Sequence, residues 1–267
     1  MPPANLESKF RNSNGDMQMD LKNRVALVTG ASRGLGAAIA RALSDQGVKV
    51  AVNYFASSKK ADAVVRAIQQ AGGVAQAFGA DVREEAQVDR LAHDVTRSLG
   101  PIDILVINAT GEQPMLPIEE INWRSCLDQL EFFVKSPLLL VKVTIAGMKA
   151  RKYGRIIQIG SEVFETGLGQ FSNYVSAKGA QLGLTRSWAR EFGPWGITVN
   201  TVSPGWIPTE RHADISDSAK NDYASRTPLK RLGVPEDVAK TVVFLASDAG
   251  AFITGQKISV NGGNTVE

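Results

Sequence analysis

Tyr174 and Lys178 lie four positions apart in the segment Tyr-Val-Ser-Ala-Lys, and their types and spacing suggest proton-transfer chemistry. On a helix this spacing places both side chains on one face, one turn apart. An ammonium group near a phenol favours the phenolate and lowers a pKa that is normally about 10, which makes the phenol a competent general acid or base. Ser161 precedes Tyr174 by thirteen residues, directly after the apolar run 155–160. A Tyr–Lys pair alone is more often a helix surface or a packing contact, so the assignment depends on the rest of the chain.

A glycine-rich turn is the second segment with a chemical interpretation. It reads Thr-Gly-Ala-Ser-Arg-Gly-Leu-Gly over residues 29–36, after an apolar run and before a helical segment. Glycines let the backbone turn tightly and approach a pyrophosphate, and the helix N-terminus offers free N–H groups and the positive end of its dipole. The alternative is that these small residues only pack a helix on a strand. The strand before and the helix after favour phosphate binding by Gly30, Ser32, Arg33, Gly34, Leu35 and Gly36.

The elements that position these groups alternate along the chain. Apolar runs predict strands at 24–29, 48–53, 74–78, 102–107, 155–160, 196–202 and 257–260. Helical patterns occupy 37–46, 57–70, 84–99, most of 114–152, 173–192 and a segment opened by Pro235. This order predicts an α/β fold with one Rossmann-type, doubly wound parallel sheet and helices on both faces. Because ligands bind at the carboxyl ends of such strands, the glycine turn, Asn108, Ser161 and Pro204–Gly205 should share one cleft.

Two parts of the chain are expected to lie outside this regular pattern. Residues 1–20 are polar and lack the apolar core of a signal peptide, so we expect a disordered extension before a single dinucleotide-binding domain at 21–267. The polar residues 208–228 predict a mobile helical insertion, within a substrate segment of about 207–228.

Composition excludes several classes of function. The 267 residues carry a net charge of +3 from dispersed basic residues, which does not suggest a nucleic-acid partner. Two histidines and one cysteine make a structural zinc site very unlikely, and we expect no metal. The single Cys126 excludes an internal disulfide and fits a reducing compartment. No run approaches the roughly 20 apolar residues that cross a bilayer. We therefore expect a cytoplasmic protein without a membrane partner.

Together, these motifs resemble the short-chain dehydrogenase/reductase family. The resemblance rests on Thr-Gly-x-x-x-Gly-x-Gly, Ser161 and Tyr174-x-x-x-Lys178, and it extends from Leu21 to about Gly263. The segment 204–209, Pro-Gly-Trp-Ile-Pro-Thr, is similar to the family's Pro-Gly-x-Ile-x-Thr, which closes on the nicotinamide. Within the family the chain looks most like bacterial 3-oxoacyl-carrier-protein reductases and their relatives.

The resemblance implies a role for each residue. Tyr174 would give a proton to a carbonyl oxygen or take one from an alcohol, and Ser161 would hydrogen-bond the substrate oxygen. Lys178 would hold the cofactor ribose and lower the Tyr174 pKa. The remaining cofactor contacts implied by the family are Asp81 and Val82 at the adenine, with Asn108, Pro204, Gly205, Ile207 and Thr209.

The residue at the end of the second strand indicates whether the site prefers NAD(H) or NADP(H). A site for NAD(H) usually places an acid there, whereas this chain has Asn53, which does not repel a 2′-phosphate. Arg33 and the helix start at 57–59 could meet that phosphate, as in the family's NADP members. The alternative is that Arg33 and Lys59 are solvated surface charges. We predict a preference for NADP(H) over NAD(H).

Two positions depart from the family pattern. The family's Asn-Asn-Ala-Gly is Ile-Asn-Ala-Thr at 107–110 in this chain. The family's helix Asn, which completes a proton relay to the active-site Lys, falls at Leu130 when counted from Trp123 and at Phe133 when counted back from Gly154. Neither position is Asn. The relay would then be rebuilt, through Gln129 or water, or weakened.

Substrate and assembly are the least determined properties. Glu162, Phe164 and Trp206 fall on loops expected to line a substrate pocket, although each could equally be idle or packing. We expect an NADP(H)-dependent oxidoreductase that interconverts a ketone and a secondary alcohol. Of the two docking bases of carrier-protein reductases only Lys152 remains, with Trp195 at the other position, which favours a small free substrate. The alternatives are a 3-oxoacyl-carrier-protein reductase and a non-catalytic, cofactor-binding regulatory protein. The family also implies a homotetramer or homodimer.

Overall fold

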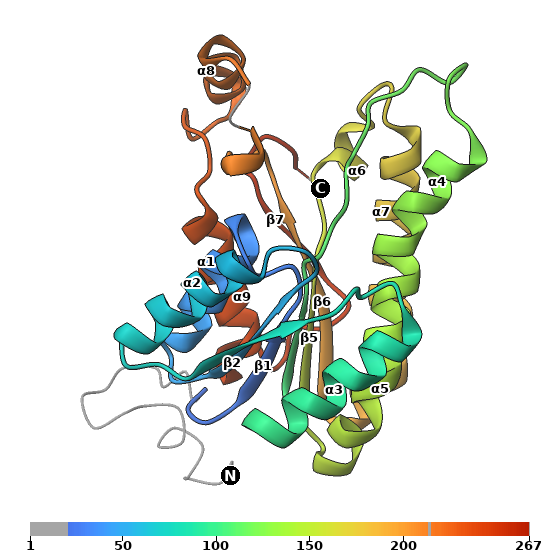
Figure 1. Ribbon diagram of the computed structural model, residues 1–267. Helices are drawn as coiled ribbons and strands as arrows, with labels where there is room; N and C mark the ends of the chain where they lie inside the picture. The colour runs from blue at the N-terminus through green and yellow to red at the C-terminus, as the bar shows by residue number, and fades with distance from the viewer. Residues whose placement is uncertain (1–20, 213–214, 267) are drawn as a thin grey trace, which may run out of the picture.

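A seven-stranded sheet with every neighbouring pair parallel forms the centre of the computed structural model, which describes residues 21–212 and 215–266 (Figure 1). The strand order is β3-β2-β1-β4-β5-β6-β7. The strands are β1 Val25–Val28, β2 Lys49–Tyr54, β3 Ala75–Gly79, β4 Ile104–Ile107, β5 Gly154–Ile159, β6 Ile197–Pro204 and β7 Lys257–Val260. The predicted Rossmann-type sheet is confirmed, and its order reverses between β1 and β4. The expected extension at 1–20 lies outside the described residues.

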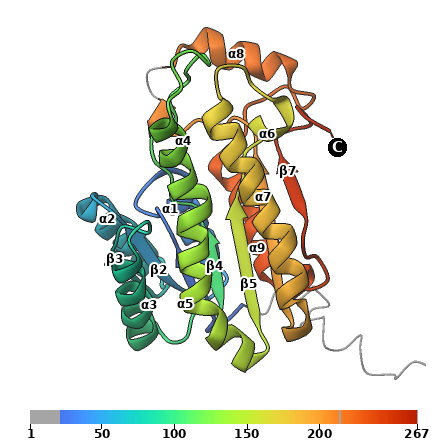
Figure 2. The same ribbon diagram turned by 90° about the vertical axis from the view of Figure 1, so that its right-hand side faces the viewer.

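Helices cover both faces of the sheet (Figures 1 and 2). They are α1 Gly34–Ser44, α2 Ser58–Gln70, α3 Glu85–Leu99, α4 Trp123–Leu130, α5 Ser136–Arg151, α6 Val163–Thr166, α7 Ser172–Phe192, α8 Asp217–Arg226 and α9 Pro235–Ala246. The strand residues alternate between two apolar clusters, as the period of two in a strand requires. Ala26 and Val28 pack with α1, α2 and α9, whereas Val25 and Leu27 pack with α3, α5 and α7.

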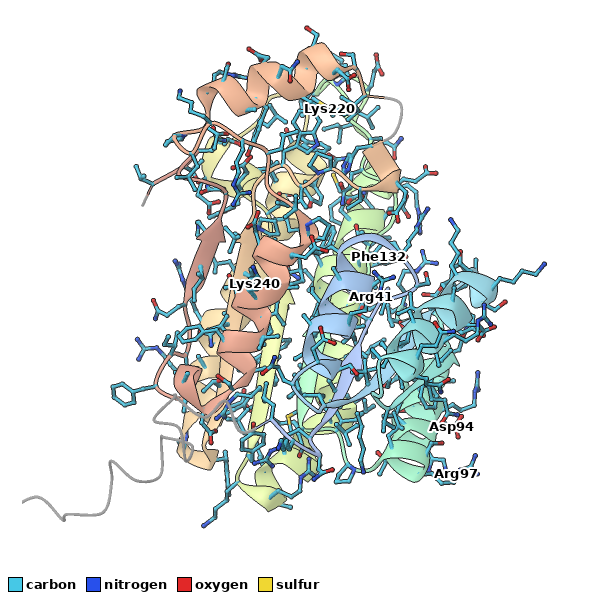
Figure 3. All side chains as sticks on the ribbon, turned by 90° about the vertical axis from the view of Figure 1, so that its left-hand side faces the viewer. Arg41, Asp94, Arg97, Phe132, Lys220 and Lys240 are labelled. Atoms are coloured by element: carbon cyan, nitrogen blue, oxygen red, sulfur yellow. The ribbon has the colours of Figure 1, made fainter. Side chains whose placement is uncertain are left out.

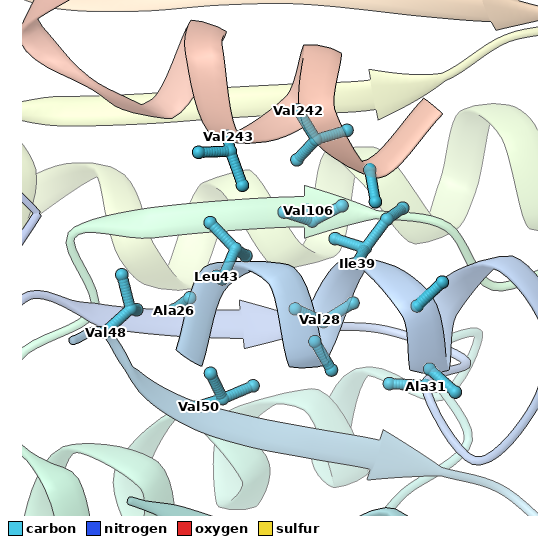
Figure 4. Packing of buried hydrophobic residues seen from close by; sticks show 14 of the residues in the cluster. Ala26, Val28, Ala31, Ile39, Leu43, Val48, Val50, Val106, Val242 and Val243 are labelled. Carbon is cyan, nitrogen blue, oxygen red and sulfur yellow. The ribbon is translucent and has the colours of Figure 1, made fainter. Parts of the chain in front are cut away.

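The contact between α1 and α9 illustrates this packing (Figure 4). Ile39 and Leu43 of α1 meet Val242 and Val243 of α9 over the strands, and all four side chains are buried. The helix that carries the glycine turn is thereby held firmly on the sheet.

The region expected to be helical over most of 114–152 is more divided than predicted. Residues 111–122 form a loop, and α4 and α5 are joined by a π-helical turn at Glu131–Lys135. A π-helical turn accommodates an extra residue within a helix. It lies inside the span over which the two sequence counts for the family's helix Asn disagree.

The segment after β6 contains the expected helix, α8, which lies beyond the carboxyl edge of the sheet (Figure 2). Its flanks are anchored, because Ile207 and Thr227 are both buried. Residues 213–214 are not described, and the mobility of the segment stays a prediction. Within the described ranges, no helix has both the length and the apolar character needed to span a membrane.

Candidate active site

The glycine turn is held by the end of β4. The Nδ2 of Asn108 donates to the carbonyls of Thr29 at 2.9 Å and Gly30 at 3.2 Å. The Thr29 hydroxyl in turn accepts from the N–H groups of Asn108 and Ala109. Asn108 therefore holds the backbone of the glycine turn in place, and its contact with a cofactor stays a prediction.

Two glycines of the turn leave no room for a side chain. A Cβ on Gly36 would lie 2.5 Å from the Gly30 carbonyl oxygen and 2.6 Å from the Asn108 Nδ2. A Cβ on Gly30, whose φ is +62°, would lie 2.9 Å from the Ala109 Cα. The backbone is thus close-packed beneath the turn, and α1 begins inside it at Gly34. The first N–H groups of α1 have no partner within the helix, so the turn fits a pyrophosphate.

The segment after β6 covers this turn. The methyl group of Thr209 lies 3.5 Å from the position of a Cβ on Gly34. Ile207 is buried and packs against Gly233. The segment 204–209 therefore lies against the glycine turn, and its closure on a cofactor stays a prediction.

Asn53 does not lie as the sequence argument assumed. Its side chain is 2% exposed, and its Oδ1 accepts from the Gly30 N–H at 3.3 Å. Its Nδ2 donates to the carbonyls of Phe78 at 3.3 Å and Ala80 at 3.2 Å. The amide joins the glycine turn to the end of β3, where the register pairs Asn53 with Phe78 and brings the Phe78 and Ala80 carbonyls within reach.

Arg83 pairs with Asp81, one of the two residues expected at the adenine. Its guanidinium makes two contacts with the Asp81 carboxylate, at 2.9 and 2.6 Å, and lies 4.8 Å from the Phe132 ring centroid. The hydrogen bonds from Arg83 hold the pKa of Asp81 below its usual range. Val82 is buried. Arg83 was not predicted as a site residue, although its charge two positions after Asp81 could have indicated it.

A groove of about 560 Å³ runs along the outer face of α1, beside the glycine turn. Its lining includes three basic side chains, Arg33, Arg41 and Lys60, together with Thr209 and Glu210. Arg41 projects from the exposed side of α1 (Figure 3). The positive charge near Arg33 is compatible with a phosphate.

Tyr174 and Lys178 lie together on the inner face of α7. Tyr174 is 6% exposed and Lys178 is 5% exposed. The Lys178 Nζ lies 5.5 Å from the Tyr174 ring centroid and donates to the Ile159 carbonyl at 2.7 Å. It also donates to the Gln181 Oε1 at 3.1 Å. Burial lowers the pKa of the Lys178 ammonium well below its usual range.

Phe133 is one of the two candidates for the position of the family's helix Asn, and it lies beside the Tyr174–Lys178 pair. Its ring centroid is 3.7 Å from the Lys178 Nζ and 5.3 Å from the Tyr174 ring centroid. The count back from Gly154 therefore identifies the residue beside the pair, and the count to Leu130 does not. Gln129, the residue suggested for a rebuilt relay, donates from its Nε2 to the Glu112 carbonyl at 2.9 Å.

Ser161 follows β5 at the same edge of the sheet, where its Oγ accepts from the Val163 N–H at 3.4 Å. Its hydroxyl hydrogen is free of this contact, so the group can still donate to a substrate oxygen. The neighbouring Glu162 N–H donates to the Pro204 carbonyl at 3.0 Å, which joins this loop to the end of β6.

Glu162, expected to line a substrate pocket, is part of a buried hydrogen-bond network. It is 7% exposed, and its carboxylate accepts from the Tyr223 hydroxyl at 2.6 Å and the Asn264 Nδ2 at 3.1 Å. The Tyr223 oxygen also accepts from the Trp206 N–H at 2.9 Å. These partners are 61 and 102 residues from Glu162, and no local pattern could have found them.

Trp206 and Phe164 differ in their surroundings. The Trp206 ring makes edge contacts with Tyr223, at 5.4 Å, and His212, at 6.4 Å. Phe164 is 41% exposed, and its ring packs over Gly179 on α7. Trp206 thus borders the α8 segment, whereas Phe164 packs on α7 at Gly179.

Comparisons with known proteins agree on one family. The model of the family described as Enoyl-(Acyl carrier protein) reductase matches residues 30–265. The chain is 40% identical to the 3-oxoacyl-[acyl-carrier-protein] reductase FabG of Staphylococcus epidermidis, over 90% of this chain and 98% of that protein. It is 36% identical to the FabG of Escherichia coli, over 92% and 98% of the two chains.

Solved structures give the same result. A mutant short-chain dehydrogenase/reductase of Serratia marcescens superposes with a TM-score of 0.84 at 34% identity, covering 92% of this chain and 99% of that one. A blue fluorescent protein from a metagenomic library, solved in complex with NADPH, gives a TM-score of 0.85 at 34% identity, covering 92% and 100%.

Proposed function

The chain belongs to the short-chain dehydrogenase/reductase family of oxidoreductases, and on that premise we propose that it interconverts a ketone and a secondary alcohol with NADP(H). The observation that carries this proposal is the buried pair on α7, in which the Lys178 ammonium lies 5.5 Å from the Tyr174 ring. A buried phenol beside a buried cation is suited to proton transfer near neutral pH.

Three side chains of this chain perform the proposed chemistry. The Ser161 hydroxyl donates a hydrogen bond to the substrate oxygen, a stabilisation of developing charge that contributes roughly 2–4 kcal/mol. The Tyr174 hydroxyl gives its proton to that oxygen in reduction and takes one back in oxidation. The Lys178 ammonium favours the phenolate and holds the ribose. When bound, the nicotinamide cofactor supplies or accepts the hydride.

The backbone around the glycine turn supports a dinucleotide site. Cβ atoms on Gly30 and Gly36 would collide with neighbouring backbone, and Gly34 lies under Thr209. Gly30, Ser32, Gly34, Leu35 and Gly36 would hold the pyrophosphate, and Asp81 and Val82 would border the adenine. Pro204, Gly205, Ile207 and Thr209 would close on the nicotinamide end.

The preference for NADP(H) is supported by Arg33, which is exposed beside the turn, and by a relative that binds NADPH. Asn53 supports the preference only indirectly, because its amide is engaged with backbone groups. Phe55 and the 57–59 helix start are then the groups after β2 that would face the adenosine ribose.

The proposed function is tested by following NADPH oxidation with a panel of ketones. Tyr174→Phe keeps the ring and removes the proton, so turnover should fall by more than tenfold while NADPH binding persists. A variant that keeps more than a tenth of the wild-type turnover would show that Tyr174 is not the proton donor. NADPH binding without turnover of any ketone by the wild-type chain would favour the non-catalytic alternative.

A free small ketone or secondary alcohol is the substrate class that we propose. Trp195 takes the place of one docking base, and Trp206 offers an apolar surface beside α8. The second candidate is a 3-oxoacyl-carrier-protein reductase, which the names of the relatives favour. One structural observation also favours it, because the Lys149 Nζ lies 5.7 Å from the Trp195 ring and supplies a positive charge there.

The ratio of kcat/KM values for an acetoacetyl carrier-protein conjugate and for free ketones decides between these candidates. A conjugate preferred by a hundredfold or more would establish the second one. In that case Lys149→Ala should lower kcat/KM for the conjugate and leave the values for free ketones unchanged.

We further propose assembly into a homodimer or homotetramer. The outer face of α7 carries small exposed residues, Ser176, Ala180, Gly183 and Ser187, which would allow close approach of a second copy. Light scattering of dilute protein that gave only the monomer mass of 28.6 kDa would contradict assembly. A cytoplasmic location also stays a prediction.

A further inference from the structure

Lys178 is surrounded by a defined set of groups. An ammonium has three N–H donors. In this structure two of them reach oxygens, the Ile159 carbonyl at 2.7 Å and the Gln181 Oε1 at 3.1 Å. The face of the Phe133 ring lies 3.7 Å away. The Ile159 contact belongs to the backbone, so Gln181 is the oxygen contact that a side-chain substitution can remove.

A glutamine at position 181 is not explained by packing alone. It is 1% exposed, one turn after Lys178 on the inner face of α7. Its Nε2 has no hydrogen-bond partner within the described part of the chain. A buried, unpaired amide N–H destabilises a fold, whereas methionine would fill a similar volume without that penalty. A side chain that lowers stability where an apolar one fits indicates a role outside folding.

The buried Lys178 ammonium needs a hydrogen-bond acceptor to stay protonated. Burial favours its neutral form, as the lowered pKa of this lysine indicates. Charged groups on the neighbouring elements are engaged elsewhere. Glu131 contacts Arg83 and Arg124, Glu162 contacts Tyr223 and Asn264, Glu165 pairs with Lys257, and Asp128 pairs with Arg124. A neutral acceptor that contacts the ammonium therefore has a large influence on its protonation.

We propose that Gln181 is a positioning residue, whose Oε1 holds the Lys178 ammonium in place beside Tyr174 and keeps it protonated. The inference rests on the proposed roles of Tyr174 and Lys178 and adds to them a residue that acts through the lysine. It also explains how the site functions with Phe133 at the position of the family's helix Asn, because a phenyl ring supplies no oxygen. Gln181 supplies one from the catalytic helix itself.

The charge on Lys178 determines the direction in which the Tyr174 pKa should change in Gln181→Met. Without the Gln181 oxygen, the neutral form of Lys178 becomes more favourable and less positive charge acts on Tyr174. The pKa of the Tyr174 phenol should then rise in Gln181→Met, by at least about half a pH unit, which is a threefold change in the ionisation constant.

The test is a titration of tyrosinate absorbance in the free protein, which needs neither cofactor nor substrate. The chain has four tyrosines, and burial raises the pKa values of Tyr153 and Tyr223. Subtracting the curve of the matching Tyr174→Phe protein isolates Tyr174 in each background. Thermal unfolding of the same proteins measures stability.

Thr185→Val is the matched control. Thr185 lies one turn after Gln181, and its hydroxyl contacts Gln158 at 2.6 Å and Thr201 at 2.7 Å in the same buried layer. This variant should lower the melting temperature and leave the Tyr174 titration unchanged. Gln181→Met should raise the Tyr174 pKa and change the melting temperature little, because the lost contact with the Lys178 ammonium is offset by removal of the unpaired Nε2.

Other results overturn the proposal. An unchanged Tyr174 pKa in Gln181→Met, or a pKa that rises equally in Thr185→Val, would leave Gln181 without a specific effect on the pair. A Gln181→Met protein that fails to fold would give Gln181 a structural role. Failure of the proposed function is seen separately, as turnover that survives Tyr174→Phe.

Discussion

The Lys178 ammonium lies over the ring of Phe133, 3.7 Å from its centroid. A buried cation over an aromatic face gains up to about 2 kcal/mol. The ring therefore offsets part of the penalty of burying Lys178, and it stands at the position where the family has an amide. Contact with this ring favours the charged form of Lys178, whereas burial favours the neutral form.

Phe133→Leu should therefore reduce turnover by about tenfold, because loss of about 1.4 kcal/mol of cation–π stabilisation favours the neutral lysine. The measurement is kcat for ketone reduction at neutral pH. Phe132→Leu is the control, since the Phe132 ring faces Arg83 at 4.8 Å and covers Gly111. Equal losses in both variants would mean that general packing, and not the contact with Lys178, is responsible.

Arg33→Ala should weaken NADP(H) binding by about tenfold, roughly 1.4 kcal/mol, and leave NAD(H) binding nearly unchanged. Arg33 is exposed at the groove beside the glycine turn, where a 2′-phosphate would meet its charge. Fluorescence titration of both cofactors measures the ratio. Arg97→Ala on α3 is a suitable control, because this exposed arginine belongs to a helix that packs on the face of the sheet opposite α1 (Figure 1). Equal affinities of the wild-type protein for the two cofactors would contradict the preference itself.

Asn53→Asp should destabilise the protein and should not convert it to NAD(H). The new carboxylate would face the carbonyl oxygens of Phe78 and Ala80, which now accept from the Asn53 amide. We expect a loss of about 3 kcal/mol, which corresponds to roughly 10 °C in melting temperature for a chain of this size. The comparison is Phe55→Asp, at a position that is 68% exposed just after β2. This variant should fold normally and gain relative affinity for NAD(H). A stable Asn53→Asp protein with switched preference would restore the original sequence argument.

The fold was predictable because strand and helix patterns are local. Each of the seven expected strands is present within two residues at its ends, and the glycine turn lies where its flanking elements require. The grouping of Ser161, Tyr174 and Lys178 at one edge follows from the parallel topology.

Side-chain directions were not predictable in the same way. Asn53 faces backbone because of the register between β2 and β3, which residues near position 53 do not encode. Glu162 is buried by partners from α8 and the C-terminal segment, both distant in sequence. Gln181 was within reach of sequence reasoning, since it is three residues after Lys178 on one helix face, but glutamine at that spacing carries no specific signal.

Tyr223→Phe should release α8 from the site, because the Tyr223 hydroxyl joins Glu162 to the Trp206 N–H. Without it, the buried Glu162 keeps only Asn264 among its described side-chain partners. Stability should fall by about 1–3 kcal/mol at neutral pH, and KM should rise more than kcat falls. Steady-state kinetics and thermal unfolding are the measurements, with Tyr54→Phe on β2 as the control.

The pH dependence of this effect has a definite sign. Burial, and then the hydrogen bond to Glu162, raise the Tyr223 pKa above its ordinary value of 10.0. The folded state therefore holds this proton more tightly than the unfolded chain. The stability that it contributes is complete below pH 10 and is lost as the pH rises further. The melting temperatures of the wild-type and Tyr223→Phe proteins should thus differ at pH 7 and converge above pH 10. A difference that stays constant into that range would show that the hydroxyl does not act through this proton.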